Sequence, residues 1–154
     1  MLAFLLPAVL LGGAYASQIF GGLHPCEMCW WQRYPPFAAV AIALVAFAVG
    51  NAGYRKALVA MAALAIGTSG VIAGFHAGVE YGWWAGPTDC GAVAPPTGGG
   101  GAGVLDDLNA FVPPSCDKAA WRDPILRLSF AGWNAVISAV LLVVALRGAL
   151  ASRT

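Results

Sequence analysis

Long apolar stretches, separated by short segments that carry most of the charge, restrict the fold of this chain more than any other feature. The first stretch, residues 2–23, has no charged residue. It is long enough to cross about 30 Å of hydrocarbon, for which roughly 20 helical residues are needed. Over the whole chain 60% of the residues are hydrophobic and 10% are charged, which is unlike ordinary soluble domains. The sequence therefore predicts an all-α membrane protein.

The other apolar stretches predict three more helices. We expect one domain over residues 1–154, with spans near residues 2–23, 30–49, 57–79 and 125–146 and outer loops at residues 24–34 and 80–124. Small residues recur every four positions in the first and third spans, a spacing that lets neighbouring helices approach closely. These residues are Gly13, Ser17 and Gly21, and Gly70, Gly74 and Gly78. The expected fold is a four-transmembrane-helix bundle.

Local sequence adds two expectations about the spans. Pro35 and Pro36 suit the first turn of the second helix, where a missing N–H costs little, although this span needs residues 30–34 to reach full length. The triplet Ala14-Tyr15-Ala16 resembles the cleavage site of a signal peptide, but no basic region precedes the apolar stretch. We therefore expect the first span to be retained.

The long segment at residues 80–124 has a different composition from the spans. It holds most of the acidic residues and prolines and the run Gly98–Gly101, so we expect an aqueous loop. Within it, apolar residues fall on one side of a short helical pattern: Val104, Leu105, Leu108, Phe111 and Val112. Two interpretations stay open, a short interfacial helix lying flat on the membrane and a turn that covers the helix ends.

Basic residues predict the orientation in the membrane. Arg55, Lys56, Arg147 and Arg153 share one side of the bundle with no acid beside them, so that side should be cytoplasmic. Both termini are then inside, and all seven acids and all four cysteines are outside. In a bacterium this places the protein in the inner membrane with periplasmic cysteines. The net charge of +1 gives no indication of a nucleic-acid partner, and the expected surroundings are membrane lipid.

Cys26 and Cys29 form a C-x-x-C pair at the expected membrane edge, and Cys90 and Cys116 lie in the long loop. Pairs with C-x-x-C spacing exchange readily between dithiol and disulfide because one thiol has a lowered pKa. Such a short ring is a poor structural staple, since closing it removes little unfolded-state entropy. We therefore interpret the two pairs as a relay by disulfide exchange, with two structural disulfides as the alternative.

The electrons of such a relay need an acceptor. The sequence has no dinucleotide fingerprint and no haem-attachment C-x-x-C-H, because Trp30 follows Cys29. It also has no metal box, because the two histidines lie far apart in sequence. A lipid-soluble quinone, either ubiquinone or menaquinone, is the simplest acceptor for a protein of this composition.

Two further side chains are candidates for binding the quinone. If the second helix already turns at Cys29, then Arg33 lies one turn further on the same face, where it would stabilise a thiolate and a quinol anion. The alternative for Arg33 is an interfacial anchor. His76 stands one turn before Glu80, and it either contacts a quinone carbonyl or forms a helix-end pair with Glu80.

These features together resemble the DsbB family of disulfide bond formation proteins. The specific part is P-C-x-x-C-x-x-x-R, which runs from Pro25 to Arg33, followed by four spans and a separated cysteine pair in the second outer loop. Weaker support comes from His76 and from Trp121. The resemblance implies a thiol:quinone oxidoreductase that reoxidises a soluble thioredoxin-fold oxidant of the DsbA type.

The resemblance also implies roles for single residues. Cys90 would receive the attack of the partner's thiolate, Cys116 would then attack Cys26, and Cys29 would be left as a thiolate beside the quinone. Arg33 matches the family arginine that helps to bind the quinone, and His76 matches a histidine near the same ring. A glycine-rich insert at residues 98–103 departs from the family pattern and bears on the choice of partner.

Two other functions are compatible with parts of the pattern. The vitamin K epoxide reductase family also combines a helical bundle with a C-x-x-C pair and loop cysteines, but there the C-x-x-C comes after the loop cysteines. A non-catalytic scaffold with disulfide-bonded or zinc-bound cysteines is the second alternative, although the cysteine spacing is loose for a zinc finger. The order of the cysteines favours the DsbB family.

Overall fold

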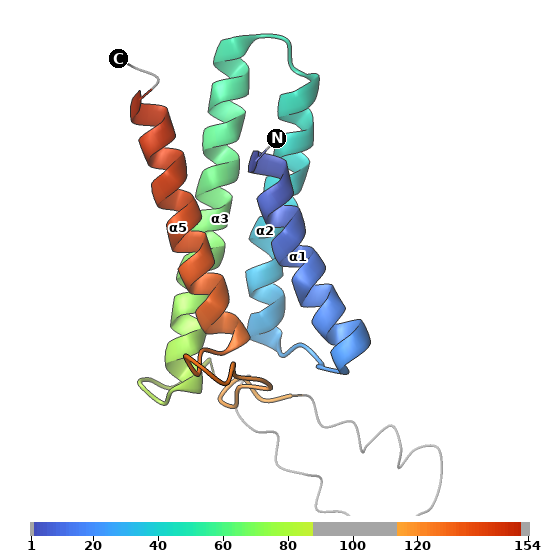
Figure 1. Cartoon of the computed structure of the whole chain (residues 1–154), viewed down its shortest axis with the longest axis vertical. Coiled ribbons are helices and arrows are strands. Elements are labelled where there is room, and N and C mark those ends of the chain that lie inside the picture. Colours follow the sequence, from blue (N-terminus) through green and yellow to red (C-terminus); the bar gives the residue numbers. More distant parts are fainter. Residues whose placement is uncertain (1, 88–113, 152–154) are drawn as a thin grey trace, which may run out of the picture.

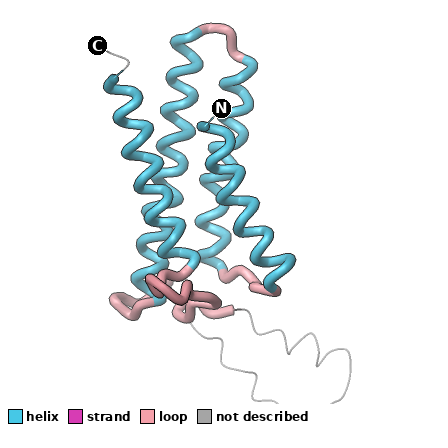
Figure 2. Tube along the Cα trace, viewed as in Figure 1, coloured by secondary structure: helices cyan, strands magenta, loops and turns pink. Residues whose placement is uncertain are grey.

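Four long helices form the described part of the chain, which covers residues 2–87 and 114–151 of the computed structural model. They are α1 (Leu2–Gly21), α2 (Glu27–Ala48), α3 (Ala52–Glu80) and α5 (Phe130–Ala151). The helices run side by side as a bundle (Figure 1), and Figure 2 shows only helices and loops in the described residues. The all-α prediction is confirmed.

The connections of the bundle gather at two ends. The α1–α2 connection and residues 114–129 lie together at one end, whereas the α2–α3 turn and the end of α5 lie at the other (Figure 1). Cys90, the glycine-rich insert and the expected loop helix at residues 104–112 lie outside the described residues. The expectations for that loop therefore stay predictions.

Many large apolar side chains point outward from the helices, and most of the buried apolar ones are small. The contact between α2 and α3 is built on Ala39, Ala62 and Ile66. In contrast, exposed side chains on the same helices include Leu44, Phe47, Leu64 and Val71. A soluble bundle buries its large apolar side chains, whereas helices in lipid pack through small residues. The packing is that of a bundle surrounded by lipid.

Gly70 shows why small residues are needed between α3 and α5. A Cβ atom added at Gly70 would lie 2.7 Å from the Cβ of Ser138, so only glycine allows this approach. Gly74, one turn further along α3, has open space around the same position. The glycine stripe expected on this helix therefore brings a neighbouring helix close at one position and not at the next.

Two helices are long and apolar enough to cross a membrane by length and composition, namely Phe4–Gly21 within α1 and Ala52–Glu80, which is α3. A shorter apolar helix covers Phe130–Ala145 within α5. The first two turns of α2 contain Glu27, Gln32 and Arg33, and this helix is not among those two. The number of four spans stays a prediction.

The start of α2 differs from the expected helix. The helix begins at Glu27, so Pro35 and Pro36 lie inside it and not in its first turn. Pro36 has no N–H for the carbonyl of Gln32 four residues earlier, and the hydroxyl of Ser69 on α3 donates to that carbonyl at 2.8 Å. A neighbouring helix thus replaces the bond lost at Pro36, which helps the helix to continue through this residue.

The start of α5 also differs, because the expected span at residues 125–146 begins five residues too early. The carboxylate of Asp123 accepts hydrogen bonds from the backbone N–H groups of Ile125, Leu126 and Leu128, which folds this segment into a turn. The helix then starts at Phe130. Local bonds from a short acidic side chain compete with helix formation, and here they delay it.

Candidate active site

The C-x-x-C pair lies where α2 begins. Cys26 is the N-cap residue, and its Sγ accepts a hydrogen bond from the backbone N–H of Cys29 at 3.2 Å. The two Sγ atoms lie 2.7 Å apart, and both cysteines are free thiols. Capping the helix therefore also brings the two sulfur atoms together.

The two thiols have different surroundings. Cys26 is buried, whereas Cys29 is partly exposed to a cavity. The hydrogen bond to Cys29 and, next, burial raise the pKa of the Cys26 thiol above its ordinary value. The proton of the pair is therefore held by Cys26, and Cys29 is the sulfur that carries negative charge more easily.

His76 on α3 faces the cysteine pair. Its Nε2 lies 3.6 Å from Cys26 Sγ, and its side chain is buried. The side-chain amide nitrogen of Gln32 lies 2.5 Å from His76 Nδ1. With the amide as a donor, this contact assigns the ring proton to Nε2, the nitrogen that faces the sulfur. Glu80 Oε1 is 3.8 Å from Nε2, and the other carboxylate oxygen accepts from Ser129. The helix-end pair with Glu80 is thus the weaker of the contacts of His76.

Gln32 joins α2 to both α3 and α5. Its Oε1 accepts from Asn134 Nδ2 of α5 at 3.0 Å, and the same amide nitrogen donates to Ser69 Oγ of α3 at 3.2 Å. Ser138 Oγ donates to Asn134 Oδ1 at 3.1 Å. Within the described residues no buried side-chain polar atom lacks a partner. This connected network holds the ring of His76 in one orientation.

Arg33 is buried and is held by α1. Its guanidinium donates to Gln18 Oε1 at 2.9 Å and to the carbonyl of Ala14 at 3.2 Å. It also stacks over the rings of Tyr15 and Trp30, each 5.0 Å from the centroid. Among the described residues no carboxylate pairs with it, since the one ion pair there joins His76 and Glu80. A buried cation without a carboxylate partner is suited to binding an anion.

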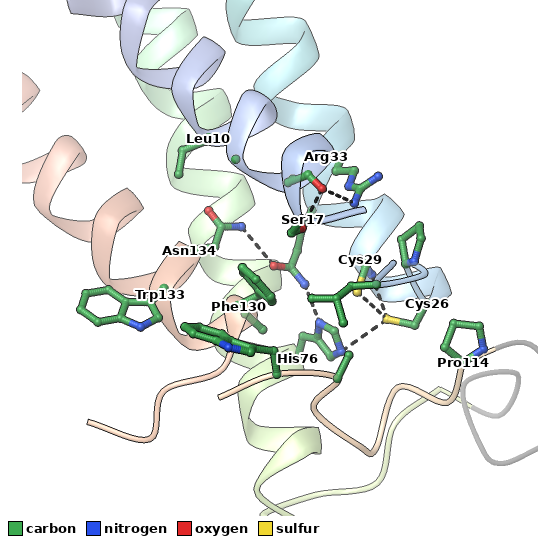
Figure 3. A pocket seen from close by; sticks show the side chains of 18 of the residues that line it. Leu10, Ser17, Cys26, Cys29, Arg33, His76, Pro114, Phe130, Trp133 and Asn134 are labelled. Carbon is green, nitrogen blue, oxygen red and sulfur yellow. Dashed lines mark hydrogen bonds between the residues drawn. The ribbon is translucent and has the colours of Figure 1, made fainter. Parts of the chain in front are cut away.

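A cavity of about 420 Å³ opens beside the cysteine pair. Its lining includes Cys29, Arg33 and His76, and Figure 3 shows these side chains around the same space. Residues of α1 form one wall: Val9, Leu10, Gly13, Ala14 and Ser17. Residues of α5 form the opposite wall: Phe130, Trp133, Asn134 and Ile137. The cavity is thus largely apolar, with its polar groups gathered near the sulfur atoms.

Cys116 lies next to the pair although it is far away in sequence. It is fully buried in one cluster with Cys26, Met28 and Val79. Cys116 is disulfide-bonded, and Cys90 lies outside the described residues. The fold therefore places a loop disulfide against the buried sulfur of the C-x-x-C pair.

Sequence reasoning named Cys26, Cys29, Cys116, Arg33 and His76, and the structure brings all five to one end of the bundle. It missed Gln32 as a partner of His76. With a helix that begins at Glu27, Gln32 lies one turn after Met28 on the inward face. This position would have indicated a buried role for Gln32. The two prolines concealed that helix start.

A helical bundle packed for lipid, with a C-x-x-C pair next to an apolar cavity, defines a class of membrane thiol oxidoreductases. The family model described as "Disulfide bond formation protein DsbB" matches residues 1–147, and the chain therefore belongs to the DsbB family. A similar curated protein is "Disulfide bond formation protein B" of Marinobacter nauticus, 29% identical over 153 residues. That match covers 94% of this chain and 86% of the relative, and no solved structure matches significantly.

Membership of this family has direct consequences. The protein is an oxidoreductase of disulfide bond formation, and it belongs to a family of membrane proteins. The assignment agrees with the order of the cysteines, which favoured the DsbB family over the vitamin K epoxide reductase family.

Proposed function

We propose that this protein reoxidises a periplasmic thioredoxin-fold oxidant of the DsbA type and passes the electrons to a membrane quinone. The observation that carries the proposal is the cavity of about 420 Å³, which Cys29 lines together with Arg33 and His76. Membership of the DsbB family supports the same reaction.

The cavity fits a quinone by size and by chemistry. Pockets for small ligands are mostly apolar, with a few polar groups that fix the orientation. Here Gly13, Ala14 and Ser17 leave room on the α1 side, and Arg33 places donors close to Cys29. A bound quinone supplies an acceptor for two electrons and two protons. Arg33 would hold it through its N–H groups at the cavity, and the ring of His76 would line the same site.

The cysteines carry the electron pair by disulfide exchange, in which each step forms one S–S bond and breaks another. A partner thiolate attacks Cys90 and displaces Cys116 as a thiolate. Cys116 then attacks Cys26 of an oxidised C-x-x-C pair, which releases Cys29 as a thiolate at the cavity. The burial of Cys116 and Cys26 in one cluster supports this step.

The partner's second thiolate then breaks the mixed disulfide, which releases the oxidised partner and a Cys90 thiolate. Cys90 attacks Cys116 and restores the loop disulfide, which leaves Cys26 and Cys29 as the reduced pair. Overall the partner loses two electrons and two protons, which a bound quinone would accept.

Arg33 and His76 act on different sulfur atoms in this scheme. Arg33 lies one helical turn after Cys29, so its positive charge stabilises the released thiolate. His76 directs its Nε2–H toward Cys26 and stabilises negative charge there while the sulfur is exchanged. Arg33 thus stabilises negative charge on Cys29, and His76 stabilises it on Cys26.

The proposed location is the bacterial inner membrane, with four spans, cytoplasmic termini and periplasmic cysteines. Arg55 and Lys56 at the start of α3 lie at the end of the bundle opposite to Cys26, which supports this orientation. A membrane-impermeant thiol reagent should label Cys29 in intact, reduced spheroplasts. Labelling only after lysis would contradict the proposed sidedness.

The reaction is tested with the purified full-length protein, a reduced thioredoxin-fold partner and either ubiquinone or menaquinone. Quinol should form, and Cys29→Ser should abolish its formation while the helical content is retained. Thr68→Ala is a suitable control, because this exposed side chain bonds only to the carbonyl of Leu64 in its own helix. Quinol formation by Cys29→Ser at the wild-type rate would exclude the relay.

A further inference from the structure

Three possible metal-ligating atoms from two parts of the chain, the C-x-x-C pair and α3, meet at the site. The Sγ atoms of Cys26 and Cys29 and a ring nitrogen of His76 all lie within 4.8 Å of one another. We infer that the reduced Cys26–Cys29 pair and His76 form a binding site for one zinc ion. This inference goes beyond the proposed quinone reaction and does not depend on it.

The distances suit tetrahedral zinc. With Zn–S bonds of about 2.3 Å and Zn–N bonds of about 2.0–2.1 Å, a sulfur and a nitrogen ligand lie roughly 3.6 Å apart. Cys26 Sγ and His76 Nε2 are 3.6 Å apart. The two sulfur atoms, now 2.7 Å apart, must separate by about 1 Å to reach the spacing of two thiolate ligands. Cys29 borders the cavity, so a rotation of its side chain provides this movement.

Gln32 prepares the histidine for this role. A metal-bound histidine usually gives its second ring N–H to a hydrogen-bond acceptor, which fixes the ring. Gln32 already contacts Nδ1 of His76, and turning its amide would present Oε1 as the acceptor and free Nε2 for the ion. The turn gives up the bond from the same amide nitrogen to the Met28 carbonyl at 3.3 Å, and Asn134 would turn as well so that its Oδ1 accepts from Gln32.

The surroundings favour a cation with this ligand set. Two thiolates neutralise the charge of Zn²⁺, so a buried site stays neutral overall. The Glu80 carboxylate lies 3.8 Å from His76 Nε2 and adds negative charge nearby. The cavity beside Cys29 and His76 gives the ion access and leaves its fourth position open for water.

Binding of zinc is coupled to the redox state of the pair. A Cys26–Cys29 disulfide offers no thiolate, so only the reduced pair binds the ion. Once bound, the ion occupies both sulfur atoms and removes them from disulfide exchange. Zinc would therefore hold the protein in its reduced form and inhibit it.

The test is a titration of the chelator-treated, anaerobically reduced full-length protein with Co²⁺, followed by displacement with Zn²⁺. One equivalent should bind and give thiolate-to-cobalt charge-transfer absorption. To remove the other thiols, the titration is repeated in the Cys90→Ser/Cys116→Ser background, where binding should persist. The oxidised protein and Cys29→Ser should show no such band. Partner and quinone are absent, so the result is independent of the proposed reaction.

Two histidine variants decide whether the site is the one inferred. His76→Ala should weaken binding at least about tenfold, since even partners outside the ligand set cost about 10–100-fold in affinity. His24→Ala is the matched control, because His24 borders the same cavity but is not one of the three donors. Unchanged affinity in His76→Ala, equal binding by the oxidised protein, or no binding at all would overturn the inference.

Discussion

The two ends of the bundle are built from different kinds of contact. Toward the α2–α3 turn, the helices meet through small apolar side chains such as Ala39, Ala43 and Ala62. At the cysteine end the buried side chains include polar ones, among them Gln32 and His76, beside apolar ones such as Met28. Apolar packing tolerates many sequences of similar volume, whereas a buried polar network fails when one partner is lost. The contacts toward the α2–α3 turn thus stabilise the bundle, and those at the cysteine end position the side chains of the site.

The largest effect is expected from Arg33, which belongs entirely to the polar end. Arg33→Ala removes a buried charged donor worth about 1.5–3 kcal/mol, so the KM for quinone should rise roughly 10–100-fold. Reaction with the thioredoxin-fold partner should change much less. The measurement is quinol formation at varied quinone concentration.

Arg55→Ala is the matched control for Arg33→Ala, because Arg55 is exposed at the opposite end of the bundle. Arg33→Lys keeps the charge but loses the forked donors to Gln18 and Ala14. The KM for quinone of Arg33→Lys should therefore lie between those of Arg33→Ala and Arg55→Ala. If all three variants share the wild-type KM for quinone, Arg33 is an anchor and not part of the quinone site.

Gly70 tests the packing of the apolar part. Gly70→Ala places a methyl group against Ser138, which should destabilise the bundle by about 1–3 kcal/mol. Gly74→Ala meets open space on the same helix and should be neutral or slightly stabilising, because alanine favours helix. Thermal unfolding in detergent, followed by circular dichroism, distinguishes the two. Equal stability of both variants would mean that α3 and α5 can separate without cost.

Gln32 tests whether the polar network acts through His76. Gln32→Leu leaves His76 Nδ1 and Asn134 without their partner, and a loss of about 1–1.5 kcal/mol corresponds to a roughly tenfold lower kcat. The KM for quinone should stay near the wild-type value. Gln32→Glu offers the ring an acceptor in place of the donor, which moves the ring proton to Nδ1 and away from Cys26, so it should not recover the kcat. A change in KM alone would assign Gln32 to quinone binding instead.

The smallest effect is expected at the turn before α5. Burial opposes ionisation of Asp123, but hydrogen bonds from three backbone N–H groups and from the Trp133 indole outweigh it and lower the pKa of the carboxyl. A lowered folded-state pKa contributes stability that is present above the unfolded value, about 4, and lost as pH falls through the folded value. Asp123→Asn should therefore flatten the acid side of the stability curve. If Asp123→Asn loses stability at acid pH in the same way as the wild type, the Asp123 carboxylate does not contribute to the pH dependence of stability.

Much of the architecture was predictable from patterns of single residue types. Uncharged apolar stretches predicted the helices, because a backbone in lipid must satisfy its own hydrogen bonds. Helix starts were less predictable. The bond from Ser69 that lets α2 pass through Pro36, and the turn around Asp123 that delays α5, both depend on partners outside the local pattern.

The candidate site divides in the same way. The spacing of Cys26 and Cys29 indicated thiol chemistry, and the sequence also singled out Arg33 and His76. The family resemblance placed His76 near the same quinone ring as Cys29, but its direct contact with Cys26 arises from the packing of α3 against α2. The same packing is what gathers three metal-ligating atoms from a sequence that has no metal motif.

The sequence by itself determined the class of protein, because hydrophobic length and cysteine spacing are properties of neighbours along the chain. Tertiary structure decided which polar groups share the buried end. Gln32 contacts His76 and Asn134 only after three helices have packed, and Cys116 reaches Cys26 only when residues 114–129 fold over the bundle. Contacts across such distances in sequence are fixed by packing, which no local pattern records.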